Sequence, residues 1–448
     1  MSDTNPAAAR AADLVAAAMK AGADAADVLY VRDASTQVSV RLGALEDVQR
    51  SDGEEIGLRL FIGRRSASVS SSDLSAAAMT ALVERAVAMA REAPEDPYAG
   101  LAPADLLATG ATVDVEIDDG GTASPAELKA RALEAEDAAR AVPGITNSEG
   151  GSASASRATI ALATSTGFAR AYATTSYGCS ASVIAGAGGA MQRDYASHGA
   201  RHLADLEPAG IIGERAGRRA VARLDPRQLP SGQMPVVYDP RVSAGLLGPL
   251  IGAITGSAIA RRTSFLLDQL GEQLFAPGIR VIDDPRRPRG LRSRPFDGEG
   301  LPTARREIVA DGRLTGWIAD AASARQLDMA PTGHASRGIG GSPGAGSTNL
   351  HLAAGTASVA DLIADITLGF WVIELIGSGV NGLTGDYSRG AAGFAIRDGQ
   401  LAEPVAEVTI AGNLKAMYRA LMPASDLEYR AGTNAPTVRI DGMTVAGA

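Results

Sequence analysis

The chain has 448 residues, more than one ordinary hydrophobic core organises, so two or three domains are expected. Hydrophobic residues make up 46% and charged residues 21%, as in globular proteins, and the net charge of -9 argues against nucleic acid as a partner. The single cysteine, Cys179, excludes an internal disulfide, fits a reducing compartment and is interpreted as a buried structural thiol. The first six residues lack the basic and apolar regions of a secretory signal.

Residues 1–93 are predicted to form a small α+β domain. The periodicity and turn residues indicate, in order, a helix at 6–20, strands at 28–32, 37–42 and 56–62, and a helix at 74–93. Pro94, Pro97 and Pro103 then mark a linker.

Residues 94–228 form a middle region that we expect to pack with the first domain. A helix at 125–141 precedes a run of small alternating residues at 145–187, which predicts an antiparallel meander, and a further helix follows at 211–224. His198 and His202 are four residues apart, but no Glu follows His198, so the zinc-protease pattern H-E-x-x-H is absent. We interpret the two histidines as surface polar residues.

Residues 229–448 read as a β-rich C-terminal domain with mostly antiparallel sheet. The whole chain is therefore predicted to be α+β, with an N-terminal two-layer α/β domain ahead of this β-rich part. Residues 242–260 carry no charge, yet four glycines and a proline make them too weakly apolar for a membrane span, so a buried helix is expected. Gly248, Gly252 and Gly256 would form one bare stripe on that helix, predicted to pack closely against another backbone.

A glycine-rich loop follows an apolar β-run that ends at Ile376. Gly377, Gly379 and Gly382 spell G-x-G-x-x-G, the dinucleotide-binding fingerprint, which requires a helix to begin at the loop. Further glycines, at 385, 390 and 393, disfavour such a helix, so nucleotide binding is not expected here.

The same loop is part of a wider resemblance. Residues 376–394, IGSGVNGLTGDYSRGAAGF, are similar to the C-terminal signature of the PmbA/TldE branch of the TldD/PmbA family. Four more segments resemble the family in the same order along the chain: residues 57–63, 296–300, 404–414 and 440–447.

This resemblance implies two kinds of subunit. The TldD-type subunit is a zinc metallopeptidase with H-E-x-x-x-H on a helix, whereas the PmbA/TldE-type subunit lacks the ligands and pairs with it. With the register anchored at residues 263–264 and 271–272, the motif positions fall near Leu247, Gly248 and Gly252, none of which binds zinc. No His lies between residues 203 and 333, so no catalytic and no metal-binding residue is predicted in this chain, and zinc is expected in the partner.

The resemblance thus predicts a non-catalytic subunit of a cytoplasmic heterodimeric zinc peptidase that acts on unfolded or small peptides. Its partners would be a TldD-type subunit and the peptide, with no nucleic acid and no membrane. Six loop residues are the candidates for contacting peptide or partner: Asn381, Gly382, Asp386, Tyr387, Ser388 and Arg389. Asp386 and Arg389 could pair with each other or reach the partner. Three alternatives stay open: a self-sufficient peptidase with an unrecognised site, a peptide-binding scaffold without peptidase activity, and a homodimer of isolated chains.

Overall fold

The computed structural model describes residues 4–447, with side chains described from residue 6. The expectation about a secretory signal rests partly on residues 1–3, which lie outside the described residues.

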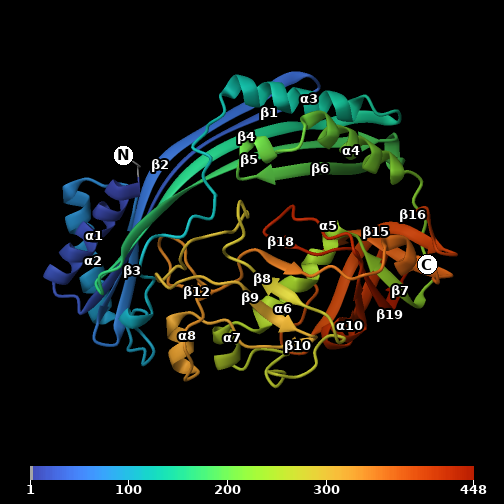
Figure 1. Ribbon diagram of the computed structural model, residues 1–448. Coiled ribbons are helices and arrows are strands. Elements are labelled where there is room, and N and C mark those ends of the chain that lie inside the picture. Colours follow the sequence, from blue (N-terminus) through green and yellow to red (C-terminus); the bar gives the residue numbers. More distant parts are fainter. Residues whose placement is uncertain (1–3, 448) are drawn as a thin grey trace.

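The first half of the chain builds one six-stranded antiparallel sheet that curves as an arch over the rest of the molecule (Figure 1). In order across the sheet the strands are β3 (Arg65–Ser71), β2 (Ala44–Ile62), β1 (Ala25–Arg41), β4 (Ile145–Thr164), β5 (Ala169–Ala185) and β6 (Gln192–Ala200). The pairing of β4 with β5 and β6 confirms the predicted meander. Strands β1 to β3 come from the predicted first domain and β4 to β6 from the middle region, so the two regions share one sheet. The boundaries at residues 93 and 228 stay predictions.

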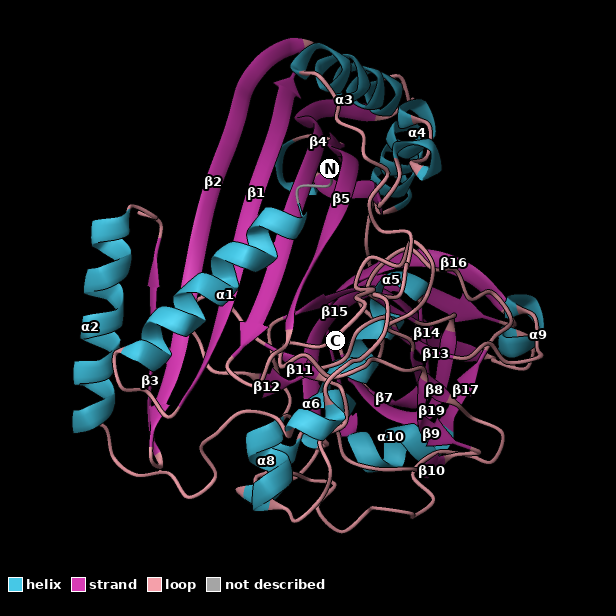
Figure 2. Ribbon diagram, turned by 60° about the vertical axis from the view of Figure 1, so that its left-hand side comes forward, coloured by secondary structure: helices cyan, strands magenta, loops and turns pink. Residues whose placement is uncertain are grey.

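Four helices cover the outer face of the arch. They are α1 (Thr4–Lys20), α2 (Ala76–Glu92), α3 (Pro125–Arg140) and α4 (Ala209–Ala222). Figure 2 shows α1 and α2 over one end of the sheet and α3 and α4 at the other. Val28 and Tyr30 of β1 belong to the core under α1 and α2, and Val38 and Val40 to the core under α3 and α4. These even-numbered positions share one face because side chains alternate along a strand.

The middle region places its candidate residues in structural roles. Cys179 of β5 is buried under α3 and α4, which raises the pKa of its thiol to about 11 and confirms a buried structural thiol. His198 lies in β6 and accepts a hydrogen bond from the Glu207 N–H at 3.1 Å. The ring of His202 is hydrogen-bonded to the Glu116 carbonyl at 2.8 Å. The two histidines therefore do not share a helix face.

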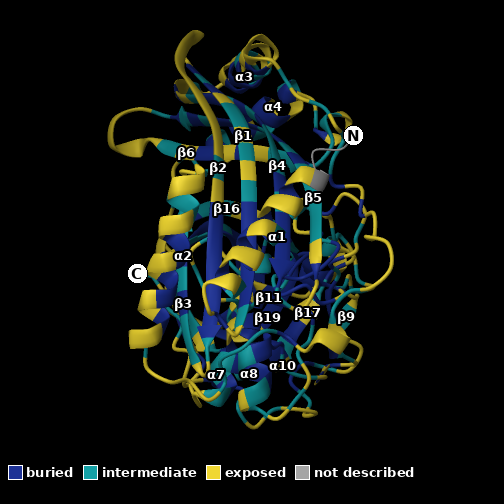
Figure 3. Ribbon diagram, turned by 90° about the vertical axis from the view of Figure 1, so that its left-hand side faces the viewer, coloured by how far each residue is buried: buried dark blue, intermediate teal, exposed yellow. Residues whose placement is uncertain are grey.

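One half of β2 has no neighbour on its outer edge. Strand β3 pairs only with residues 56–62, while residues 44–55 of β2 pair only with β1. Most side chains in this half are exposed, and Figure 3 shows it projecting at the end of the arch near α3.

The C-terminal region contains two larger sheets and a short two-stranded one. Five strands of the first sheet close on themselves, because β16 pairs with both β15 and β19. In order this sheet contains β16 (Gln400–Asn413), β15 (Asp386–Arg397), β14 (Leu368–Ile376), β7 (Gly232–Tyr238), β19 (Val438–Ala446) and β17 (Leu421–Pro423). Only β14 and β7 run parallel within it.

The second sheet is smaller and has one parallel pair, β13 with β18. Its order is β10 (Arg313–Leu314), β9 (Arg306–Ala310), β8 (Val281–Asp283), β13 (Leu350–Leu352) and β18 (Thr433–Asn434), and the two-stranded sheet is β11 (Ala335–Ser336) with β12 (Gly344–Ala345). The short helices are α5 (Pro240–Ser243), α6 (Leu247–Ala253), α7 (Gly256–Ala260), α8 (Ala321–Gln326), α9 (Val359–Ile363) and α10 (Leu414–Ala420). The predicted α+β class, with a two-layer N-terminal part and a β-rich, mostly antiparallel C-terminal part, is confirmed.

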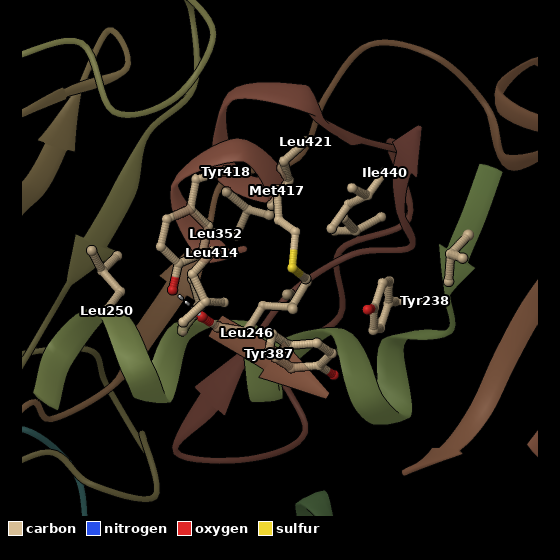
Figure 4. Close-up of a cluster of buried hydrophobic side chains, with 14 of the residues drawn as sticks. Tyr238, Leu246, Leu250, Leu352, Tyr387, Leu414, Met417, Tyr418, Leu421 and Ile440 are labelled. Carbon is tan, nitrogen blue, oxygen red and sulfur yellow. Dashed lines mark hydrogen bonds between the residues drawn. The ribbon is translucent and has the colours of Figure 1, made fainter. Parts of the chain in front are cut away.

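The C-terminal core gathers side chains from α6, α10 and the closed sheet (Figure 4). Leu246, Leu250 and Tyr418 are almost fully buried there. The Tyr418 hydroxyl donates a hydrogen bond to the Leu246 carbonyl at 2.8 Å, which satisfies a polar group that burial would otherwise leave without a partner.

The uncharged segment at 242–260 is not the single buried helix that its sequence predicts. It forms α5, the 3₁₀ turn Ala244–Leu246, α6 and α7, and the helix breaks at Thr255. There the backbone pairs with Ile318, whose N–H donates to Ile254 and whose carbonyl accepts from Gly256. None of the helices within residues 4–447 is long and apolar enough to cross a membrane.

The predicted glycine stripe is correct at only one of its three positions. A methyl group at Gly256 would lie 2.5 Å from the Ser323 hydroxyl oxygen, so this glycine permits a close contact. Gly248 and Gly252 are exposed, and a methyl group there would meet nothing within 4 Å. The prediction of close packing is wrong for these two, because they lie on the solvent side of α6.

The inner face of the arch is fixed to the C-terminal region by four buried charged side chains, Asp27, Arg59, Glu299 and Arg337, here called the buried seam. Arg59 and Arg337 both donate to Asp27, at 3.1 Å from Arg59 Nε and 2.5 Å from Arg337 Nη1. Burial alone would raise the pKa of Asp27, but the two guanidinium groups outweigh it and hold the pKa below its ordinary value. Glu299 Oε1 lies 3.8 Å from Arg59 Nη2.

Candidate functional site

The predicted contact residues lie on the connection between β14 and β15, residues 376–389, here called the glycine hairpin. Strand β15 begins at Asp386 and no helix follows the glycines. The structural context of the dinucleotide fingerprint is therefore missing.

The hairpin is braced by its own hydrogen bonds. The Asn381 side-chain oxygen accepts from the N–H groups of Leu383 and Thr384, at 2.9 and 3.3 Å. The Ser388 N–H donates to the Gly379 carbonyl at 2.7 Å. A methyl group at Gly379 would lie 1.6 Å from the Ser388 carbonyl oxygen, so glycine is required where the two arms meet. The shape of the hairpin is thus set within its own backbone.

The hairpin is also anchored to two neighbouring segments. The Phe265 N–H donates to the Gly382 carbonyl at 2.9 Å, and the Leu414 N–H donates to the Gly385 carbonyl at 2.7 Å. The first contact lies just beyond α7 and the second at the start of α10. These bonds hold the hairpin beside the segment that carries α6 and α7.

Asp386 and Arg389 are engaged separately. Asp386 accepts from the Thr384 hydroxyl at 2.7 Å and from the Asn413 amide at 3.1 Å, and these hydrogen bonds hold its pKa below the ordinary value. Arg389 Nε donates to the Ile376 carbonyl at 3.4 Å. The structure therefore does not support mutual pairing of the two charges.

The six predicted residues differ in accessibility. Asn381, Gly382, Asp386 and Ser388 are exposed, and Arg389 is half-buried. Tyr387 is only 3% exposed and belongs to the C-terminal core, so its side chain is not available for contact at the surface. The alternation of β15 turns it inward between two outward neighbours.

Two exposed apolar side chains of the hairpin were not predicted from the sequence. Ile376 is 61% exposed and Leu383 is 62% exposed, both unusual for large aliphatic residues. The signal was available in the sequence, since each is a large apolar residue beside or within a run of glycines and polar residues. Both side chains add apolar surface to the exposed part of the hairpin.

The strands beside the hairpin offer little free edge for an added strand. Strand β15 pairs with β14 on one side and β16 on the other, and Val380 bridges Tyr387 where β14 ends. Among the described strands, long edges without a paired neighbour lie in the arch instead, at residues 44–55 of β2 and along β6. Binding of a peptide by strand addition next to the glycine loop is therefore not supported by the pairing.

The residues that the resemblance places at the zinc motif do not fit a metal. Leu247 is buried at 1% exposure and has no donor atom, and Gly248 and Gly252 present no side chain. Within residues 4–447 no group of three or more His, Cys, Asp and Glu side chains is placed to hold a metal ion. No catalytic step through zinc can be derived from this donor set.

Comparison with known proteins covers most of the chain. Models of the PmbA/TldA metallopeptidase match in three parts: domain 1 at residues 26–90, the central domain at 118–224 and the C-terminal domain at 231–447. The chain is 38% identical to Metalloprotease PmbA of Escherichia coli over 426 residues, which cover 95% of this chain and 92% of that protein.

Two solved structures have the same fold. A Bacteroides thetaiotaomicron protein proposed to be a modulator of DNA gyrase superposes with a TM-score of 0.90 at 27% identity, covering 98% of both chains. TldE from Thermococcus kodakarensis has a TM-score of 0.87 at 21% identity and covers 97% of this chain and 99% of its own, which is a likeness of fold alone. The chain belongs to the PmbA/TldD metallopeptidase family, in its PmbA/TldE branch.

Proposed function

We propose that this chain is the non-catalytic subunit of a cytoplasmic, two-subunit zinc peptidase that acts on unfolded or small peptides. The observation that carries the proposal is the chemistry of α6 at the position of the zinc motif. In the register that the resemblance implies, a buried leucine and two exposed glycines take the places of the two histidines and the glutamate of the TldD-type motif.

In this division of labour the TldD-type partner would hold the zinc, whose chemistry there would be to polarise the scissile carbonyl and to activate a water molecule. This chain would help to enclose the peptide-binding cavity and would contact the partner subunit. The exposed glycines of α6 let another chain approach the helix backbone closely, since Gly248 and Gly252 have open space in front of them.

The glycine hairpin is the second element of the proposed contact surface. Ile376 and Leu383 would become buried against the partner, and burial of a large aliphatic side chain stabilises by about 1.5–3 kcal/mol. Asn381, Gly382, Asp386, Ser388 and Arg389 surround them, and because the hairpin is braced it loses little conformational freedom on binding.

Zinc content and reconstitution test this function. The chain, purified alone and from a complex with a TldD-type subunit, is analysed for zinc and assayed on an unfolded peptide. We expect no stoichiometric zinc in this chain, one zinc per partner subunit, and hydrolysis only in the mixture. A matched variant, Leu383→Ser, should remain folded and lower the affinity of assembly.

Two outcomes contradict the proposal. One tightly held zinc in the isolated chain, lost on chelation together with peptidase activity, would establish a self-sufficient enzyme. Failure to associate with any TldD-type subunit, with peptide binding retained, would favour a scaffold. Sedimentation of the isolated chain decides in the same experiment whether it forms homodimers.

A further inference from the structure

A groove lies between the middle region and the C-terminal sheet, outside the surfaces discussed so far. Its volume is about 470 Å³, within the range of about 300–1,000 Å³ typical of small-molecule sites. It is lined by α4, α5, one residue of β6, strands β14 and β15 and the start of β16: Asp194, Ile211, Glu214, Arg215, Arg218, Arg219, Ala222, Asp239, Arg241, Trp371, Ile373, Phe394 and Leu401.

One wall of the groove is apolar. Trp371 and Ile373 of β14 lie beside Phe394 of β15 and belong to a small core on the outer side of the closed sheet. Ile211 and Leu401 also line the groove, and they are 49% and 50% exposed. Large aliphatic side chains half-open to solvent around an aromatic wall provide a surface that an apolar group of a ligand would cover.

The charged wall contains four arginines, and three of them already have carboxylate partners. Arg215 binds Glu207 through two hydrogen bonds of 3.0 Å. Arg218 pairs with Glu214 and Arg241 with the buried Asp194. Each of these three cations therefore has an ion-pair partner within the chain, although Glu207 is shared with Arg430 and Asp194 with Arg223.

Arg219 is different. Its recorded hydrogen bond is to the Tyr195 carbonyl at 3.2 Å, and no carboxylate of the described chain lies within 4.0 Å of its guanidinium. Burial and the neighbouring Arg241 lower its pKa, and the carboxylates of Asp194 and Asp239 offset this lowering only in part. The nearby Asp239 is occupied by the Trp371 indole N–H and the Arg241 backbone N–H.

We propose that this groove binds small amphipathic carboxylates, with the apolar body against Trp371, Ile373 and Phe394 and the carboxylate on Arg219. Arg219 beside an apolar wall is complementary to such a ligand, because a carboxylate there would pair with the one lining arginine that has no carboxylate within 4.0 Å in the described chain. The carboxylate could come from a free aliphatic acid or from the C-terminus of a peptide that ends in an apolar residue. The inference does not depend on the proposed peptidase partnership.

The chain provides a reporter inside the groove. It has two tryptophans, Trp317 and Trp371, so Trp317→Phe leaves the emission of Trp371 alone. This variant, as the full-length chain, is titrated with sodium octanoate, with octanol and with octylammonium. We expect saturable binding of octanoate, binding of octanol weaker by roughly tenfold, and no binding of octylammonium.

Variants at Arg219 test whether its guanidinium binds the carboxylate of the ligand. Arg219→Gln should weaken octanoate roughly tenfold and leave octanol unchanged, whereas Arg219→Glu should reject octanoate and accept octylammonium. Lys129→Gln, an exposed cation on α3 away from the groove, changes the net charge equally and should leave all three affinities unchanged. Melting temperatures of the variants show that they are folded.

The source of the carboxylate is decided with acetyl-Ala-Leu bearing a free carboxylate and the same dipeptide as a C-terminal amide. Binding of the acid but not the amide assigns the groove to peptide C-termini, and binding of octanoate alone assigns it to free acids. The proposal is overturned if octanoate leaves Trp371 emission unchanged, if octanol binds as tightly as octanoate, or if folded Arg219→Gln binds octanoate as the parent does.

Discussion

The buried seam and the glycine hairpin are both polar, irregular parts of the structure, but they hold their polar groups in opposite ways. In the seam, Asp27 of the arch pairs with Arg337 of the C-terminal region, a partner 310 residues away in the sequence, as well as with Arg59 of its own sheet. In the hairpin, Asn381 and Asp386 bind neighbours within five residues and Asn413 of the adjoining strand. The seam joins distant regions, whereas the side-chain hydrogen bonds of the hairpin act locally and its outer surface stays exposed.

Asp27→Ala should have the largest effect. The substitution leaves Arg59 and Arg337 buried without their carboxylate, and breaking a buried ion pair from one side costs about 3–5 kcal/mol. Urea unfolding should show this as a large drop in the free energy of unfolding. Asp386→Ala is the matched control in the hairpin, where the carboxylate is solvent-exposed, and it should leave the midpoint close to that of the parent chain.

Glu299→Gln should stabilise the chain, and only above acidic pH. Burial raises the pKa of Glu299 from 4.5 to about 7, so between these values the folded chain holds a proton that the unfolded chain releases. Stability from this group is therefore lost as pH rises from 4.5 to about 7. Glutamine stays neutral and keeps an oxygen for the Ala321 N–H.

The gain should reach up to about 3 kcal/mol at pH 8 and vanish near pH 4. Urea midpoints of parent and variant at several pH values measure the difference directly. A difference that does not change with pH would mean that Glu299 has the same pKa in the folded and the unfolded chain, so that burial does not disfavour its charge.

Gly379→Ala should have a moderate effect confined to the hairpin. The added methyl would lie 1.6 Å from the Ser388 carbonyl oxygen, so the two arms must separate, at about 1–3 kcal/mol. Gly382→Ala is the control, because its methyl would meet its nearest atom only at 4.0 Å. Thermal unfolding compares the two. Equal melting temperatures would show that the two arms of the hairpin can separate at little cost in free energy, despite their hydrogen bonds.

Local features of the fold were within reach of the sequence. The helix at Pro125–Arg140 is capped by Ser124, which forms a capping box with Glu127, and this pattern can be recognised in the sequence. The alternation of small residues in β4 and β5 predicted the meander. The inward position of Tyr387 followed from the same alternation, with Asp386 and Ser388 on the outside, but the glycine-rich setting obscured it.

Contacts between residues far apart in the chain could not be predicted from the sequence. The helix breaks at Thr255, where the backbone pairs with Ile318, 63 positions later; Thr255 caps α7 locally, but nothing within 242–260 identifies the distant partner. Likewise, the seam depends on the loop that carries Arg337 docking against the arch, where a methyl at Gly57 would collide with the Ile339 carbonyl. Sequence periodicity describes only local geometry. It therefore placed Gly248, Gly252 and Gly256 on one face of a single helix, whereas the chain bends between Gly252 and Gly256.

Gly252→Leu should have the smallest effect on the isolated chain. A side chain at this exposed position of α6 meets nothing within 4 Å, and leucine favours helix over glycine by up to about 1 kcal/mol, so the free energy of unfolding should stay equal or rise slightly. Gly256→Ala, one turn further in sequence, should instead destabilise by about 1–3 kcal/mol because its methyl would lie 2.5 Å from the Ser323 hydroxyl.

Gly252→Leu also tests whether the exposed side of α6 contacts a partner subunit. If a TldD-type subunit covers α6, the leucine of Gly252→Leu fills space that the partner needs, so assembly and peptide hydrolysis should fall while the isolated chain keeps its melting temperature. Unchanged titration curves with the partner would place the interface elsewhere and leave the glycine hairpin as the contact to test. A lowered melting temperature of the isolated chain would instead mean that α6 packs against this chain's own backbone, which would remove the contrast between Gly252 and Gly256.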